Sequence, residues 1–450
     1  MQDNLEHKLK NRHLQMIALG GVIGTGLFYG SAKSIQLTGP SIILSYILGG
    51  LIIYIIMRAL GEMTVYNPNS GSFSAYANEY VGNYAGFISG WSAWFEYTVV
   101  CMAELTAVTV FFDFFTLGIP HWILCAIILI FFTLINLISV KTFAEFEFWF
   151  AGIKIIAIIL MIIFAAYLII FNGNTSHEFT NNELNQYKHL NMLFHGGLKG
   201  FLVSLVIVVF AFGGSEFISI AAGEVKNPQK NIPIAINGTI FRILIFYILT
   251  MLVIILLYPY EKLSDNISPF VDVFRLIGFK SAAIIMNIVV ITAALSSFNS
   301  CLYASSRMLY SLSINKHAPH SLSKLTKNHV PKIAVLATSS AITIAVIINY
   351  IFPEKAIMYL LTVTTGAILI VWFLILITQI FFRIKKSNEQ LSYKLILFPY
   401  SNIFALMFLI LVTMVMTQMD DMKTCVYVTP IWITVLSIIY FLKFKFKKNE

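Results

Sequence analysis

Four ionisable side chains lie within long apolar stretches of the sequence. They are Glu96, Glu104, Lys154 and Glu216. In a membrane-spanning segment each would cost at least ~2.5–3.5 kcal/mol to insert, so each is a hypothesis for function. A carboxyl or an amine in such a place can exchange a proton or bind a charged ligand. Glu96 is offset from Glu104 by about 80° around a helix of about 3.6 residues per turn, and a structural role is expected for it.

Two glycine-rich clusters, Gly20–Gly26 and Phe210–Glu216, lie in the middle of apolar segments. Glycine is about 1 kcal/mol less favourable than alanine inside a helix. Non-helical backbone at membrane depth is tolerated only where it lines a cavity or is buried in protein. The clusters therefore predict two interrupted helices, in the first and sixth segments, which is a pattern typical of a transporter's binding site. The alternative is close helix packing at small residues.

An interrupted helix could bind both charges of an amino acid. Its free N–H groups carry about +0.5 charge at an N-terminus, and its free carbonyls about −0.5 at a C-terminus. We expect the N–H groups near Thr25 and Gly26 to bind the carboxylate, and the carbonyls around Phe210–Gly213 to bind the ammonium. The two phenylalanines beside the second break either gate the substrate or pack. The predicted substrate-binding residues are Ile23, Gly24, Thr25, Gly26, Phe210, Phe212, Gly213, Gly214 and Glu104.

The composition places these residues in a membrane. Of 450 residues, 58% are hydrophobic and 11% are charged, and the mean hydropathy is +0.82. Soluble proteins carry about 25% charged residues, so the balance argues against a cytosolic enzyme or a nucleic-acid-binding protein. The four cysteines have neither disulfide nor zinc-site spacing, and no catalytic motif is found. No enzyme activity, metal or cofactor is expected.

Twelve segments are long enough to span a bilayer, which needs about 20 apolar residues. With both termini in the cytoplasm, 21 Lys and Arg residues fall on the cytoplasmic side and 7 outside, as expected for cytoplasmic loops. The sequence thus predicts an all-α polytopic protein of the cytoplasmic (inner) membrane with both termini inside. The segments are residues 16–35, 41–61, 86–112, 121–140, 148–171, 199–222, 237–258, 282–307, 332–352, 356–382, 400–418 and 427–442.

Several short stretches, in a fixed order along the chain, carry a family resemblance. They are Ile17–Phe28, Met57–Met63, Met102–Ala107, Glu147–Phe150, Phe210–Glu216, Glu224–Pro228, Thr292–Ser296 and Ser306–Tyr310. On these stretches the sequence resembles the amino acid–polyamine–organocation superfamily and, within it, the bacterial amino acid permeases. The resemblance implies a leucine-transporter-like fold in a single transport domain, residues 1–450. Residues 14–171 (helices 1–5) and 199–382 (helices 6–10) would form an inverted repeat, with helices 11–12 in residues 399–443 appended.

The resemblance also assigns roles to buried charges. In related transporters that work without sodium, a lysine of segment 5 takes the ion's place, and Lys154 matches it. Its ammonium would bind carbonyls and hydroxyls around the first break, and its deprotonation would release them. These groups are the carbonyls near Gly20 and Ile23 and the hydroxyls of Ser296 or Ser297. Alternatively, Lys154 extends to the cytoplasm from about 9 Å inside its helix. Glu216 matches a superfamily glutamate that responds to protonation.

Three further charged residues leave alternatives open. Glu104 could line the pocket, carry a proton, or hydrogen-bond neighbouring helices. Arg58 and Glu62, four residues apart, are expected to pair on a helix surface. The loop that begins at Glu224 is expected to fix the start of segment 7, with an inner-gate ion pair as the alternative.

The most consistent function is a secondary active transporter. It would import an amino acid by proton symport, with alternating access around the two interrupted helices. The resemblance favours a neutral or aromatic substrate, of the proline, alanine or phenylalanine class. An amino acid exchanger, a cationic amino acid permease, and a channel or non-transporting sensor are the alternatives. The expected partners are the free amino acid, protons and the lipid bilayer, without nucleic acid, for a monomer or weak oligomer.

Overall fold

The computed structural model describes residues 11–69, 71–116, 118–171, 194–257, 268–276 and 280–446, and these form helices without a β-strand. The two chain ends, whose basic residues enter the charge count above, lie outside the described residues. The long helices are α4 (Ile42–Tyr66), α6 (Asn83–Phe112), α7 (His121–Ile138), α8 (Val140–Phe171), α11 (Gly197–Phe212), α13 (Pro228–Leu257), α15 (Lys280–Ile314), α16 (Lys332–Ile351), α17 (Ala356–Lys385), α18 (Tyr400–Thr417) and α19 (Lys423–Phe446).

Within the described residues, eleven helical segments are long and apolar enough to cross a membrane. The expected first span, residues 16–35, is divided instead into α1 (Asn11–Val22), α2 (Thr25–Phe28) and α3 (Gly30–Thr38). Its pieces are too short to cross alone, because the glycine-rich cluster interrupts the helix. The first of the eleven segments, Gly30–Tyr66, begins with α3, and another, Gly197–Glu224, contains the second glycine-rich cluster. Only α1 and α2 of the expected first span therefore lie outside the eleven segments.

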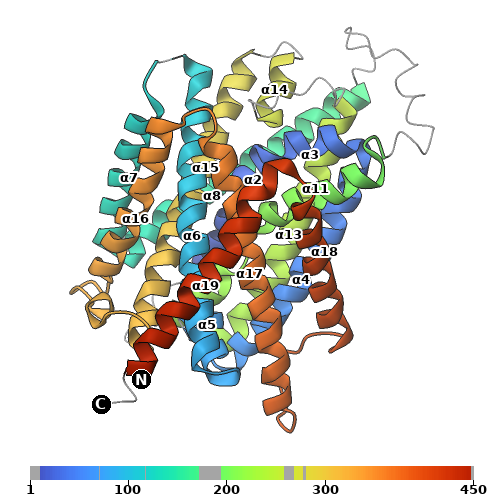
Figure 1. Cartoon of the computed structure of the whole chain (residues 1–450). Coiled ribbons are helices and arrows are strands. Elements are labelled where there is room, and N and C mark those ends of the chain that lie inside the picture. Colours follow the sequence, from blue (N-terminus) through green and yellow to red (C-terminus); the bar gives the residue numbers. More distant parts are fainter. Residues whose placement is uncertain are drawn as a thin grey trace.

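The centre of the bundle is formed by α6 and α15, which pack against each other, with α17 beside α6 (Figure 1). The helix α6 carries Glu96 and Glu104 but has no continuous polar face, and it is buried over most of its length. At the periphery, α7 packs against α16, and α18 and α19 pack against α17. The interrupted helices lie beside this centre, because α1 packs against α15 and α11 packs against α17.

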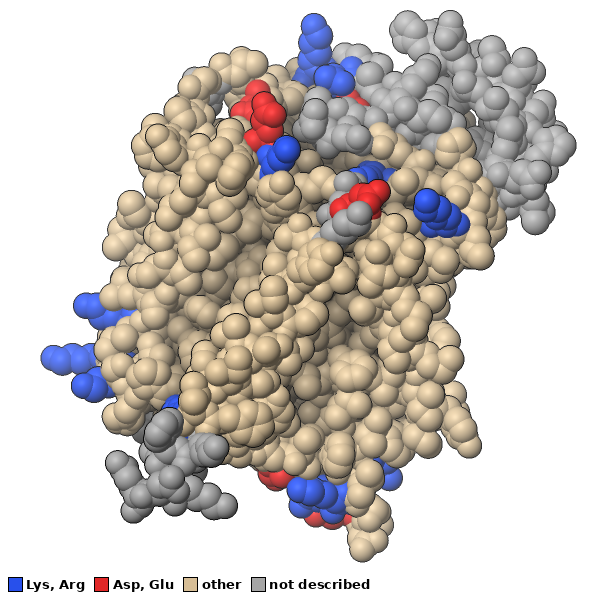
Figure 2. All heavy atoms as spheres, viewed as in Figure 1, with Lys and Arg blue, Asp and Glu red and all other residues tan. Residues whose placement is uncertain are grey.

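The outer surface of the bundle is apolar between its two ends. Large aliphatic side chains point outward along α8, where Ile156, Ile163 and Ile170 are exposed. Lys, Arg, Asp and Glu side chains gather near the ends of the helices, and a wide uncharged band separates them on the face shown in Figure 2. Such a band is far larger than the apolar patches of soluble monomers and fits the hydrocarbon core of a bilayer.

Candidate functional site

The first interruption lies at Ile23 and Gly24. Helix α1 ends at Val22, and α2 begins at Thr25. Gly24 has φ −131° and ψ −149°, so the chain is extended at this point. A Cβ atom at Gly24 would lie 2.9 Å from the Cβ of Ser297 on α15. The Glu104 carboxylate on α6 would lie closer still to that Cβ atom. The close approach of α6 and α15, rather than an unusual φ, therefore explains the glycine here.

The second interruption lies between Phe212, where α11 ends, and Phe217, where α12 (Phe217–Ile220) begins. Gly214 has φ +89°, in the left-handed region that favours glycine. Its amide donates to Oε1 of Glu216 at 3.3 Å, and the Ser215 hydroxyl donates to the Phe212 carbonyl at 2.8 Å. Hydrogen bonds between its own residues therefore stabilise this turn.

The two interruptions are in contact. A Cβ atom at Gly26 would lie 2.6 Å from Cα of Ala211, and one at Gly214 would lie 2.8 Å from the carbonyl oxygen of Gly21. The hydroxyl of Tyr247, on α13, lies 3.1 Å from the Val22 carbonyl oxygen and 2.8 Å from that of Ala211. This tyrosine, which joins both broken helices, was not among the predicted site residues. The only signal for it is a hydroxyl in the middle of an apolar segment.

Glu104 contacts the first interruption directly. The backbone N–H of Thr25 donates to its carboxylate, with N–O distances of 3.2 Å and 3.3 Å to the two oxygens. Glu104 is 3% exposed and lies on the central helix α6. Thr25 supplies one of the N–H groups that we expected to bind a substrate carboxylate, and here it binds a carboxylate of the chain.

Lys154 reaches across from α8 to the end of α1. Its Nζ donates to the carbonyl oxygens of Gly20 at 2.5 Å and Ile23 at 2.8 Å. The side chain is fully buried. The alternative in which it extends to the cytoplasm is therefore wrong for this structure, while its role in proton coupling stays a prediction.

The two serines assigned to the lysine bind elsewhere. Ser296 donates to Oε1 of Glu147 at 2.5 Å, and Ser297 donates to the Gly21 carbonyl at 3.2 Å. Glu147 is buried on the same helix as Lys154 and also accepts from Asn299. The Glu147 carboxylate is a strong hydrogen-bond acceptor, so the Ser296 hydroxyl donates to it and does not bind Lys154. Glu147 was missed, although a spacing of seven residues places it on the Lys154 face of a helix.

Glu96 and Glu216 form a second buried acidic contact, between α6 and the turn after α11. Both side chains are fully buried, and their carboxyl groups interact. Glu96 therefore has a specific partner, which the angular offset from Glu104 does not reveal. A shared proton would remove the repulsion between two buried negative charges.

The phenylalanines beside the second break differ in their surroundings. The ring of Phe212 packs against Tyr247 at 5.2 Å and Tyr46 at 6.1 Å between centroids. Phe210 is 8% exposed. Phe212 thus belongs to an aromatic cluster around the break, and the gating role of either ring stays a prediction.

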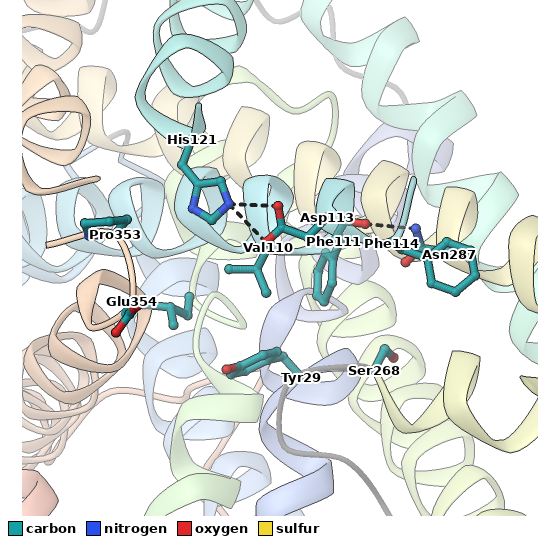
Figure 3. Close-up of a pocket in the computed structure, with 11 residues that line it drawn as sticks. Tyr29, Val110, Phe111, Asp113, Phe114, His121, Ser268, Asn287, Pro353 and Glu354 are labelled. Carbon is teal, nitrogen blue, oxygen red and sulfur yellow. Dashed lines mark hydrogen bonds and ion pairs between the residues drawn. The ribbon is translucent and has the colours of Figure 1, made fainter. Parts of the chain in front are cut away.

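A cavity of about 600 Å³ opens at the end of the bundle where α6 finishes (Figure 3). His121 points towards Asp113 across it, with Nε2 2.9 Å and 3.0 Å from the two carboxylate oxygens. Phe111, on its wall, lies seven residues along α6 from Glu104, which is about 10 Å at about 1.5 Å per residue. The eleven lining residues include none of the predicted substrate-binding residues. The cavity leads towards the interruptions without reaching them.

Towards the opposite end of the bundle, Arg307 and Glu224 form a buried ion pair. Nε of Arg307 lies 3.2 Å from Oε1 of Glu224, and both side chains are at most 2% exposed. The Arg307 guanidinium also lies 4.1 Å from the ring centre of Tyr303. The alternative ion pair through Glu224 is therefore present in the structure. Its role as a gate stays a prediction.

The expected pair of Arg58 and Glu62 is not formed. Glu62 pairs with Arg383 and accepts from the Leu395 amide at 2.8 Å. Arg58 donates to the Lys394 carbonyl at 2.8 Å. Glu62 is buried and Arg58 is partly buried against the ring of Tyr393, so a rule for exposed helix surfaces does not apply to them. Among the residues that the structure describes, no group of three or more His, Cys, Asp or Glu could hold a metal ion.

Residues 13–450 match the family model described as amino acid permease. The chain is 42% identical over 454 residues to an uncharacterized amino acid permease, YtnA of Bacillus subtilis (strain 168), covering 100% of this chain and 97% of that protein. It is 42% identical to the aromatic amino acid transport protein AroP of Escherichia coli (strain K12), covering 99% and 97%. The uncharacterized transporter YdgF of Bacillus subtilis is 41% identical, covering 98% and 96%.

Proposed function

Because the chain belongs to the amino acid permease family, we propose that it imports a neutral or aromatic amino acid across the cytoplasmic membrane by proton symport. It is a multi-pass membrane transporter and not an enzyme. We place both termini in the cytoplasm, because 21 Lys and Arg residues then lie inside and 7 outside. The cavity of Figure 3 then faces outward.

The proposed architecture is an inverted repeat. Residues 14–171 and 199–382 would be its halves, and residues 399–443 an appendage. The interrupted helices support it, because each half then carries one interruption in its first helix. A monomer or weak oligomer is the expected state.

The single observation that carries the proposal is the contact between the two interruptions. Backbone N–H groups at Thr25 and carbonyls at the end of α11 lie beside each other within the protein. A zwitterion presents opposite charges a few ångströms apart, and these helix ends offer the complementary partial charges. We propose that Ile23, Gly24, Thr25 and Gly26 bind its carboxylate. We propose that Phe210, Phe212, Gly213 and Gly214 bind its ammonium and side chain.

Proton coupling is proposed for Lys154, with Glu216 as a second group. The buried ammonium supplies donors to two carbonyls at the end of α1. A neutral lysine would leave these carbonyls with a weaker partner, so that α1 could move as the proton leaves. Glu216 is supported by its place in the second interruption and its contact with Glu96.

The substrate and the coupling can be tested in proteoliposomes. Uptake of each of the twenty amino acids would be measured under an inward proton gradient, an inward sodium gradient, and neither. Symport of a neutral or aromatic amino acid predicts accumulation under the proton gradient alone. Uptake that needs a second amino acid inside would indicate an exchanger, and selective uptake of lysine or arginine would indicate a cationic permease.

Lys154→Gln tests the coupling role. We expect it to lose the stimulation by the proton gradient and keep substrate counterflow, because the attachment of α1 to α8, which the gradient must release, depends on this amine. Lys141→Gln is the matched control, since Lys141 is an exposed lysine on the same helix. Undiminished stimulation of the Lys154→Gln variant by the gradient would show that coupling lies elsewhere.

A further inference from the structure

The carboxylate of Glu104 lies where the substrate's carboxylate is expected. Both of its oxygens are within 3.3 Å of the Thr25 amide nitrogen. The hydroxyl of Thr25 is buried beside the same carboxylate. A carboxylate group of the chain therefore already fills a position that suits a carboxylate.

Two carboxylates cannot use this amide at once. A single N–H cannot donate well to both, and two negative charges side by side in a buried site repel each other. A protonated carboxyl is neutral and a weaker acceptor, so it releases the amide more readily. We propose that Glu104 competes with the substrate's carboxylate for the Thr25 amide, and that protonation of Glu104 releases the amide so that amino acid and proton bind together. This inference rests on the proposed function.

The groups around Glu104 allow such an exchange. Lys154 on α8, Tyr247 on α13 and Cys301 on α15 are the titratable groups that face it. Lys154 is the one cation of this set, and it attracts the carboxylate while the site is empty. The cavity at the outer end of α6 is lined by Phe111, which lies about 10 Å along this helix from Glu104.

The proton that Glu104 binds is released again within one transport cycle. Glu104 takes it from the outer side as the amino acid's carboxylate binds Thr25. When the amino acid leaves on the inner side, Glu104 gives the proton to the cytoplasm and returns to the amide. The empty carrier is thereby stabilised without a bound substrate, because the amide is never left without an acceptor.

Binding measured against pH tests the inference on the purified full-length protein. The probes are radiolabelled L-phenylalanine, or the amino acid with the highest uptake in the survey above, and the amine that lacks its carboxylate, which is 2-phenylethylamine for phenylalanine. Between about pH 5 and about pH 9, the Kd of the amino acid is expected to rise tenfold per pH unit once Glu104 has ionised. The amine does not compete for the amide, so its Kd is expected to lack this rise.

Glu104→Gln keeps the size of the side chain and removes its charge. Its Kd for the amino acid is expected to stay constant over the same range, and to be at least tenfold lower than that of the natural chain at the alkaline end. Glu389→Gln, in an exposed cytoplasmic loop, is the control and should keep the natural slope. The comparison of the two ligands on the natural chain needs no variant and decides the matter if Glu104→Gln does not fold.

Three results would overturn the inference. The first is a Kd of the natural chain for the amino acid that does not change with pH, and the second is an equal pH slope for the amine. The third is a folded Glu104→Gln variant that departs from the expected behaviour. If this variant keeps the slope, Lys154 controls it; if it loses binding at every pH, Glu104 binds the ammonium. Failure of the natural chain to bind any amino acid would instead contradict the proposed function.

Discussion

Gly26 offers the sharpest test of the contact between the interrupted helices. It lies inside the short helix α2, where alanine would be favoured over glycine by about 1 kcal/mol. A Cβ atom there would lie 2.6 Å from Cα of Ala211, whereas ordinary contacts begin at 3.4 Å. In the Gly26→Ala variant α2 and α11 must therefore separate by about 0.8 Å. Overpacking of this kind costs ~1–3 kcal/mol, a factor of about 5 to about 140 in an equilibrium.

We expect the Gly26→Ala variant to fold and to lose uptake by such a factor, and the Gly26→Leu variant to lose uptake completely. The added Cβ atom destabilises the conformation in which α2 contacts α11, and the transporter must adopt this conformation in each cycle. Initial uptake rates in proteoliposomes would be normalised to the amount of protein, with Tm measured in detergent. Gly152→Ala on α8 is the matched control, because no atom lies within 4 Å of the added Cβ. Normal uptake by Gly26→Leu would refute the placement of the substrate at this contact.

The remaining predictions concern stability. Tyr247→Phe removes the donor of two buried carbonyls and should lower the free energy of unfolding by about 1–3 kcal/mol; an unchanged unfolding midpoint would contradict the role of the hydroxyl. Arg307→Met breaks a buried ion pair and should cost about 3–5 kcal/mol, most of which Glu224→Leu should restore in the double variant; additive losses would argue against the pair. Outside the spans, burial lowers the pKa of His317 to about 4, against about 6.5 when unfolded. The folded state then binds fewer protons, so this stability is complete above about pH 6.5 and is lost as the pH falls towards about 4. Tm should fall over that range and fall less in His317→Gln, whereas parallel profiles would exclude this histidine as the cause.

The positions of the spans and of their interruptions could be predicted from the sequence alone. Apolar length decides where a helix can cross, and glycine clusters mark where it need not continue. Gly214, with φ +89°, is a position where the backbone itself requires glycine. Gly24 is different, because a side chain there would collide with Glu104 and Ser297, which lie 80 and 273 residues further along the chain. A glycine cluster in the sequence predicts that the helix is interrupted. It does not show whether the glycine is required by its own φ or by a neighbouring helix.

The partners of the buried charges could not be predicted in the same way. Glu62 has an arginine four residues away, yet it binds Arg383 and a backbone amide from distant parts of the chain. Pairs at i and i+4 on an exposed helix contribute only about 0.2–0.5 kcal/mol. A buried carboxylate needs several donors at once, and these come from whichever helices surround it. Helix packing, which the local sequence does not reveal, therefore decides the outcome.

The end of α1 shows how far prediction extends. A helix that stops inside a protein leaves carbonyls that must find donors. Each carbonyl from Gly20 to Ile23 finds a donor on another helix: Lys154 binds the first and last, Ser297 the second and Tyr247 the third. The need for donors follows from the interruption, but their identity follows from the packing of α8, α15 and α13.

These donors differ in what a proton can do to them. A hydroxyl of serine or tyrosine keeps its proton throughout the physiological range of pH, whereas a buried lysine can give its proton up. Loss of the Lys154 proton would weaken only the attachment of α1 to α8 and leave its attachment to α13 and α15 in place. We therefore expect α1 to swing away from α8 about the two hydroxyl contacts, rather than to detach. A motion of this kind would open one side of the interruption while the backbone groups that face α11 stay in position.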